Sequence, residues 1–102
     1  MTHEKVSVYI NEADQWQKRP LHLELLSMLS KQGIAGGTVL RAIAGFTQEE
    51  GMVQTTLFRA GKKMPLVVEF IDDVKRIEHI LPELKKMASH RLILREPVEI
   101  VN

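Results

Sequence analysis

The chain has 102 residues, of which 44% are hydrophobic and 26% are charged, and its formal net charge is +1. These values are typical of one globular domain, which we expect to span residues 1–102. A charge so close to zero argues against a dedicated nucleic-acid-binding protein, and the absence of cysteine excludes disulfides and thiol chemistry. No apolar run approaches the ~20 residues of a membrane span, and no signal peptide precedes the first predicted strand, so we expect a cytoplasmic location.

The N-terminal third predicts a strand followed by a helix. Residues 5–10 alternate between apolar and polar side chains, as in a strand with one buried face. The polar stretch 11–19 is predicted to be a loop. Pro20 suits the first position of a helix, where its missing amide hydrogen is not needed. Leucine and methionine side chains continue at helical spacing up to Gly33, which is expected to end the helix.

A glycine-rich turn, residues 33–37, leads into a second predicted strand, residues 38–44. Glycine loops that bind phosphate leave a strand and open a helix, whose amide groups hold the anion. Here a helix precedes the glycines and a strand follows them, so we interpret them as a helix cap and a tight turn. Both faces of the strand are apolar, with Val39 on one and Leu40 on the other, and Arg41 interrupts the pattern.

The third predicted strand, residues 66–72, also has two largely apolar faces. Two such strands need a covering on each side of their sheet, but the chain has enough helix for only one side. We therefore expect oligomerisation to bury the second face of the sheet.

The second helix is predicted to begin at about Val74, with Asp72 or Asp73 as its N-cap. Pro82 lies inside this segment and cannot donate a hydrogen bond to the preceding turn. A kink, or a helix made of two pieces, is therefore expected there.

Two further strands are predicted at residues 91–95 and 98–101, on either side of Pro97. The order of the main elements is then strand, helix, strand, long loop, strand, helix, strand. This order defines an α+β fold of the ferredoxin-like βαββαβ type, an antiparallel sheet with two helices on one face.

About twenty residues, 45–65, separate the second and third strands, which is longer than most connections and indicates a functional or a disordered segment. Residues 53–58 are less polar than a solvated linker, and an apolar patch in such a loop is often an interaction site. The alternative is a short extra strand packed on the same assembly, which we favour for Leu57 and Phe58. The residues that we expect to contact a partner are Gln48, Glu49, Glu50, Met52 and Val53.

Taken together, these segments resemble the PII-like proteins, and more closely a small bacterial PII-like family of unknown function. The similarity covers nearly the whole chain and lies in residues 6–10, 33–39, 41–46, 65–72 and 80–84. It implies a compact homotrimer whose sheets face inward and a mobile T-loop that leaves the second strand after residue 46. PII relatives bind nucleotides or small effectors in clefts between subunits. They signal through that loop to a partner such as a membrane transporter or an enzyme.

The chain differs from nucleotide-binding PII proteins between the second helix and the next strand. Those proteins have a glycine-rich basic segment there, whereas residues 86–91 contain no glycine, which argues against conventional ATP binding. The guanidinium group of arginine can donate two parallel hydrogen bonds to a phosphate or carboxylate, and glycine permits the close approach of a ligand. The residues that we expect to contact a small anionic ligand or nucleotide are Arg41, Gly45, Phe46, Arg59, Lys62, Lys63, His90, Arg91 and Arg95.

Several of these residues have a second interpretation. Arg41 could instead pair with Glu69 or another acid across the sheet, since opposite charges stabilise neighbouring strands. Lys62 and Lys63 could be solvated loop residues. His90 could complement the dipole of the second helix.

Other functions fit the same fold. A small phosphatase would need an anion-holding loop after the first strand, but residues 11–15 are acidic, and no nucleophile adjoins a base, so an enzyme is not expected. An RNA-binding domain would stack bases on sheet aromatics, and only Tyr9 and Phe70 are available. A structural or protein-interaction trimer without a ligand is a further alternative. The histidines lack the spacing of a metal site, so neither metal nor cofactor is expected.

Overall fold

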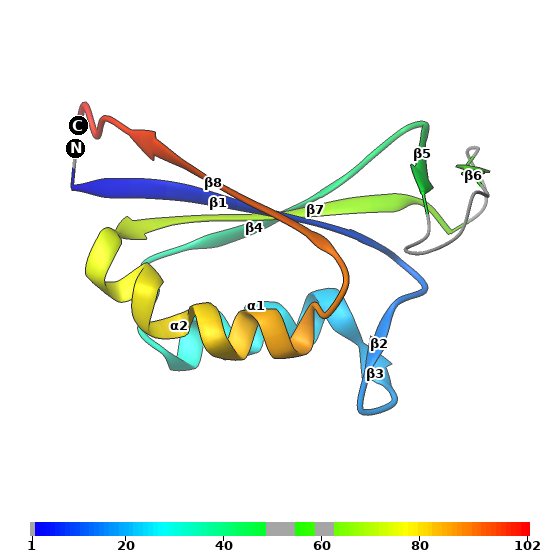
Figure 1. Ribbon diagram of the computed structural model, residues 1–102, viewed down its shortest axis with the longest axis horizontal. Coiled ribbons are helices and arrows are strands. Elements are labelled where there is room, and N and C mark those ends of the chain that lie inside the picture. Colours follow the sequence, from blue (N-terminus) through cyan, green and yellow to red (C-terminus); the bar gives the residue numbers. More distant parts are fainter. Residues whose placement is uncertain (1, 49–54, 59–62) are drawn as a thin grey trace.

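The computed structural model describes residues 2–48, 55–58 and 63–102. Four antiparallel strands form the main sheet in the order β4-β7-β1-β8, and both helices cover the same face of it (Figure 1). The elements of this α+β layer are β1 (His3–Asn11), α1 (Leu21–Lys31), β4 (Gly37–Arg41), β7 (Pro65–Asp73), α2 (Val74–Met87) and β8 (Leu92–Val98). The fold is therefore the ferredoxin-like arrangement that the sequence predicts.

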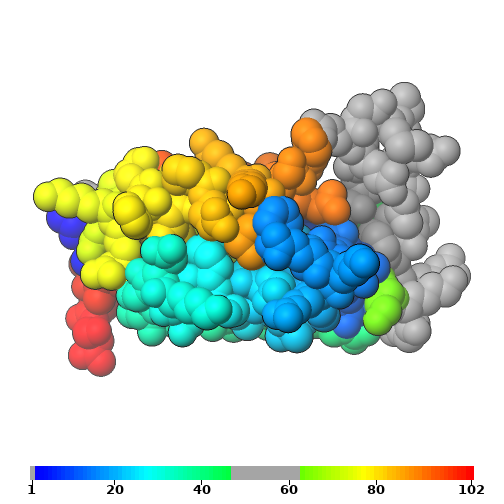
Figure 2. Space-filling view, turned by 90° about the horizontal axis from the view of Figure 1, so that it is seen from below, coloured from blue at the N-terminus to red at the C-terminus, as the bar shows by residue number. Residues whose placement is uncertain are grey.

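The core lies between the sheet and the helices. Alternate side chains of β1 and β7, among them Val8 and Val68, are fully buried against Leu25 of α1 and Ile77 of α2. From the helical side, α1 and α2 lie next to each other and form the outer layer (Figure 2). The opposite face of the sheet carries no helix (Figure 1), so the described part of the chain covers only one of the two apolar faces that the strands present.

The helix boundaries follow from their end residues. Pro20 is the residue before α1 and not its first residue, and the helix is followed by Gly33 in the left-handed conformation, with φ +82°. The side chain of Asp73 accepts a hydrogen bond from the Arg76 amide at 2.8 Å, which confirms the predicted N-cap of α2. Pro82 lies inside α2, which is one helix over Val74–Met87, so of the two predicted outcomes the helix made of two pieces is wrong. Its buried side chains continue on both sides of the proline and hold both halves against the sheet.

Replacing the N-cap tests how much it contributes. Asp73→Ala should lower the free energy of unfolding by about 1 kcal/mol, because the Arg76 amide loses its acceptor. Asp73→Asn keeps a capping oxygen and is the matched control. Urea unfolding of the three proteins at one concentration measures the difference, and equal losses in both variants would show that capping is not the cause.

Two strand predictions differ from the structure. β4 stops at Arg41 and not at residue 44, because its partner β7 begins at Pro65, to whose carbonyl Ala42 donates the last bond. Ile43 is consequently 89% exposed. The C-terminal region forms one strand, β8, instead of two. It pairs with β1 as far as Val98, which lies opposite His3, the first residue of β1. The predicted strand at 98–101 is therefore absent.

Two small hairpins occupy segments that the sequence describes as loops. β2 (Gln15–Trp16) pairs with β3 (Arg19–Pro20), so the predicted loop contains most of a short hairpin. Gln17 and Lys18 form its turn and both have positive φ. β5 (Gly45–Gln48) pairs with β6 (Thr55–Phe58) in the long connection. Leu57 and Phe58 therefore lie in a short extra strand, as expected for that part of the connection.

Candidate functional site

An apolar row crosses the uncovered face of the sheet. Leu40 in β4 lies opposite Val67 in β7, which lies opposite Tyr9 in β1, which lies opposite Leu92 in β8. The row thus includes one side chain from each of the four strands. We call these four residues the open-face row. Leu40, Tyr9 and Leu92 are all exposed in the single chain, and a contiguous exposed apolar surface of this kind is typical of an interaction site.

Charged side chains lie on the same face, farther along β1. The ammonium group of Lys5 is 3.4 Å from a carboxylate oxygen of Glu69 and 3.9 Å from one of Glu96. Exposed pairs of this type contribute about 0–1 kcal/mol each to stability. Glu69 thus lies in a pair with Lys5.

Arg41 pairs instead with Glu12, the first residue after β1. The Nε of Arg41 donates to Oε1 of Glu12 at 3.0 Å, and the Met64 amide donates to the same oxygen at 2.8 Å. Arg41 therefore forms an ion pair with an acid, as the alternative prediction has it, but Glu12 follows β1 and does not lie on β7, the strand that neighbours β4. Lys63 also acts on Glu12 electrostatically, so predicted ligand residues from both ends of the β4–β7 connection converge on one carboxylate.

These contacts determine the ionisation of Glu12. The hydrogen bond from the Met64 amide and the Arg41 guanidinium hold the pKa of Glu12 below its ordinary value of 4.5. A carboxyl group whose pKa is lowered by folding stabilises the native state above its ordinary pKa. That contribution is lost as the pH falls through the lowered pKa.

A second arginine is held by the same turn. Arg91 makes a two-pronged contact with Asp14, in which Nε donates to Oδ2 at 3.0 Å and a terminal nitrogen donates to Oδ1 at 2.8 Å. Such forked pairs are among the stronger ion pairs because both donors are aligned. Asp14 also accepts from the Asn11 amide at 2.9 Å. His90, next to Arg91, adopts φ +65° in the turn between α2 and β8.

The other predicted site residues that the structure describes have different neighbours. Arg95 contacts Glu4 and Glu78, both at 2.8 Å, and these carboxylates raise its pKa. Gly45 lies close to Pro65, and Phe46 is exposed in β5. Gln48 is the last residue of β5. The predicted residues that lie outside the described residues are Arg59, Lys62, Glu49, Glu50, Met52 and Val53.

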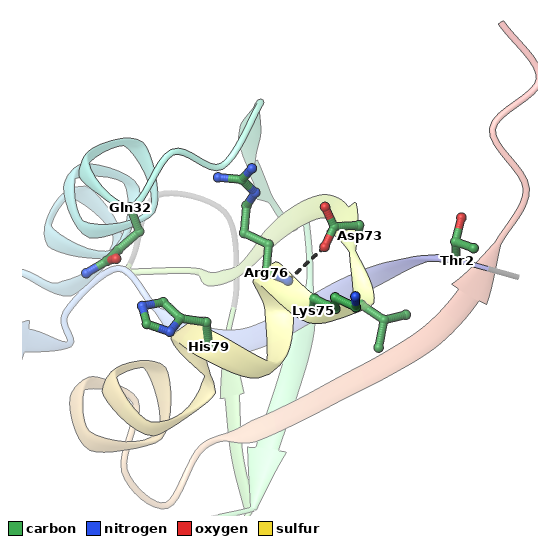
Figure 3. A pocket seen from close by; sticks show the side chains of 7 residues that line it. Thr2, Gln32, Asp73, Lys75, Arg76 and His79 are labelled. Atoms are coloured by element: carbon green, nitrogen blue, oxygen red, sulfur yellow. Dashed lines mark hydrogen bonds between the residues drawn. The ribbon is translucent and has the colours of Figure 1, made fainter.

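A hollow of about 880 Å³ that the sequence analysis did not anticipate lies at the opposite end of the sheet (Figure 3). It is lined by the first turns of α2, with Lys75, Arg76 and His79, and by Gln32 at the end of α1. The basic residues Lys75 and Arg76, with His79 a turn later, are the signal that could have indicated it. Asp72 is 3.3 Å from the Arg76 guanidinium, and the capping Asp73 also lines the hollow, so acidic side chains lie beside the basic ones.

Within residues 2–48, 55–58 and 63–102, no three His, Cys, Asp or Glu side chains gather as a metal ion would require. Neither of the helices that the structure describes is long and apolar enough to cross a membrane.

The sheet order, the two helices on one face and the long β4–β7 connection define a ferredoxin-like fold of the PII-like type. The fold matches CutA1 from Pyrococcus horikoshii with a TM-score of 0.67 and 16% identity, over 97% of this chain and 86% of that one. It matches GlnK of B. subtilis with a TM-score of 0.60 and 14% identity, over 96% and 86%. At these identities the likeness shows the fold alone.

The chain belongs to the DUF190 family, described as "Uncharacterized ACR, COG1993", whose model matches residues 3–100. A relative from Aquifex aeolicus (strain VF5), a UPF0166 protein, is 33% identical over 95 residues, which are 92% of this chain and 89% of the relative. The resemblance to a PII-like family of unknown function is therefore confirmed.

Proposed function

We propose that the protein is a non-catalytic, cytoplasmic regulatory module of the PII-like type. In this proposal it forms a homotrimer, senses a small anionic ligand or nucleotide at the clefts between subunits and contacts a partner protein through the 45–65 connection. The partner would be a membrane transporter or an enzyme. The observation that carries the proposal is the open-face row, which leaves an apolar band across all four strands exposed in the single chain.

Burial of the open-face row favours self-association. Apolar surface gains about 25 cal/mol for each Å² removed from water, and the row is continuous from one edge of the sheet to the other. The Lys5 pairs with Glu69 and Glu96 border it on the same face. Copies of one chain can therefore meet with apolar side chains at the centre and charged pairs toward the rim, the usual anatomy of an interface.

The ligand part of the proposal rests on the cations around the end of β1. Arg41 and Lys63 approach Glu12, and Arg91 is fixed on Asp14. A guanidinium group has five N–H donors, so one that is oriented by a carboxylate can present its remaining donors to a second oxyanion, which then shares the positive charge with that carboxylate. A ligand of this site would accordingly be recognised through one or more phosphate or carboxylate groups.

Two measurements test the proposal. Light scattering during gel filtration should give three times the mass of the chain. A thermal-shift panel of adenine nucleotides, cyclic nucleotides, bicarbonate and fluoride should contain at least one compound that raises the melting temperature, because a ligand of the native state stabilises it. A monomeric mass would contradict the trimer. A trimer that no compound stabilises would favour a structural or protein-interaction role, and salt-sensitive binding of single-stranded RNA would favour an RNA-binding domain.

A further inference from the structure

The two ends of the β4–β7 connection meet at a single side-chain oxygen. Arg41 is the last residue of β4, and Met64 directly precedes β7. Both donate to Oε1 of Glu12, from Nε at 3.0 Å and from the backbone amide at 2.8 Å. The amide of Glu12 in turn donates to the Met64 carbonyl at 3.0 Å. Glu12 therefore contacts Met64 through both its backbone and its side chain, and Arg41 through its side chain alone.

Several members of this group are held in place by their surroundings. Met64 is fully buried, and Ala42 donates to the Pro65 carbonyl at 2.9 Å. A Cβ at Gly45 would lie 3.3 Å from Cγ of Pro65, so the backbone there is closely packed. The side chain of Arg41, in contrast, is 54% exposed. The pair of Arg41 with Glu12 is thus the contact of this group that a dissolved anion can reach.

An oxyanion that binds the Arg41 guanidinium would compete with Glu12 for its positive charge, and also for Nε where it accepts from that nitrogen. Phosphate and carboxylate groups accept from guanidinium in the way that the Glu12 carboxylate does. The bound anion would also place a second negative charge beside Glu12, which disfavours the ionised carboxylate near it. Both effects act on the Glu12 oxygen that accepts the hydrogen bond of the Met64 amide. They therefore change the contact of Met64, the residue that directly precedes β7.

We propose that Glu12 is a positioning residue that links the binding of an oxyanion at Arg41 to the hydrogen bond that fixes Met64 at the start of β7. An anion on Arg41 loosens the Met64 bond, and an intact Met64 bond weakens anion binding. Coupling between two sites is reciprocal, so each effect has the same factor. This inference rests on the proposed function in one respect, namely that Arg41 takes part in binding an anionic ligand.

The test uses the full-length ¹⁵N-labelled protein with inorganic phosphate as the probe. Titration should shift the Arg41 Nε–H signal and, over the same concentration range, speed hydrogen exchange of the Met64 amide. In Glu12→Gln the competing charge is gone, and we expect phosphate to bind Arg41 at least about fivefold more tightly, the lower end of typical coupling. Without phosphate, the Met64 amide of this variant should already exchange faster than in the unmodified protein.

Glu96→Gln is the matched control. It removes the same charge from a carboxylate that also faces a cation, Lys5 at 3.9 Å, but it touches neither Arg41 nor Met64 in the contacts of the described residues. It should leave phosphate affinity and Met64 exchange unchanged, and equal effects in the two variants would reduce the result to net charge.

The outcomes separate this inference from the proposed function. Phosphate that shifts Arg41 while Met64 exchange stays constant overturns the coupling, and so does the absence of any phosphate effect on Arg41 in both the unmodified protein and Glu12→Gln. Neither result affects the trimer. The proposed function itself is contradicted by a monomeric mass, or by a thermal-shift panel in which no compound raises the melting temperature. Neither measurement depends on Glu12.

Discussion

If the protein forms the proposed homotrimer, Leu92→Arg should convert it into a folded monomer. Leu92 is 57% exposed in the single chain, so an arginine is accommodated there without disturbing the core. In an assembly that buries the open-face row, the same guanidinium would be placed in an apolar interface without a partner, which costs several kcal/mol for each copy. Light scattering should show a threefold fall in mass, while circular dichroism retains the spectrum of the folded chain.

Leu23→Arg provides the control for this result. Leu23 is exposed to a similar degree, 54%, but it lies on α1, on the helical side of the sheet. Its substitution should leave the mass unchanged. If Leu23→Arg dissociates the assembly and Leu92→Arg does not, the helices form the interface, and burial of the open face is refuted.

Leu25→Ala should lower the free energy of unfolding by about 2–5 kcal/mol. Leu25 is fully buried between α1 and the sheet, so truncation removes apolar contacts and leaves a cavity. Since domains of this size are stable by only about 5–15 kcal/mol, the loss is a large part of the total. Urea unfolding at one fixed protein concentration measures it, because the stability of an oligomer depends on concentration.

Leu23→Ala is the natural comparison for this core substitution. It makes the same chemical change in the same helix, two residues away, at a side chain that is half exposed. Leucine and alanine are both good helix formers, so its effect should stay within about 0.5 kcal/mol. A similar loss in both variants would mean that helix formation, and not packing, determines the result.

The fold could be predicted because its main elements have strong local patterns. β7 alternates in burial along most of its length, β1 buries Val6, Val8 and Ile10 at alternate positions, and an aspartate caps the start of α2. The errors fall where a partner strand decides the outcome. β4 ends opposite the start of β7, and β8 ends opposite the start of β1. A single sequence does not show how far the partner of a strand extends. The β2–β3 hairpin has no glycine in its turn, so its signal was missing.

The candidate site was predictable in its cations but not in their partners. Arg41 and Arg91 were selected because arginine recognises anions. Glu12 and Asp14, which hold them, were considered only as an acidic stretch unsuited to a phosphatase. The pairs span 29 and 77 residues of sequence, so only the folded chain brings them together. Charge type is visible in a sequence, whereas the pairing of distant charges depends on the topology.

Pro97 in β8 affects how many molecules can join through their sheets. β8 is an edge strand, and exposed edges let sheets of separate molecules join into growing ribbons. A proline there cannot donate an amide hydrogen to a neighbouring strand, and β4 at the other edge has only five residues. Growth from edge to edge is therefore disfavoured on both sides. Association through the face of the sheet can instead close on itself around a rotation axis and stop at a fixed number of copies.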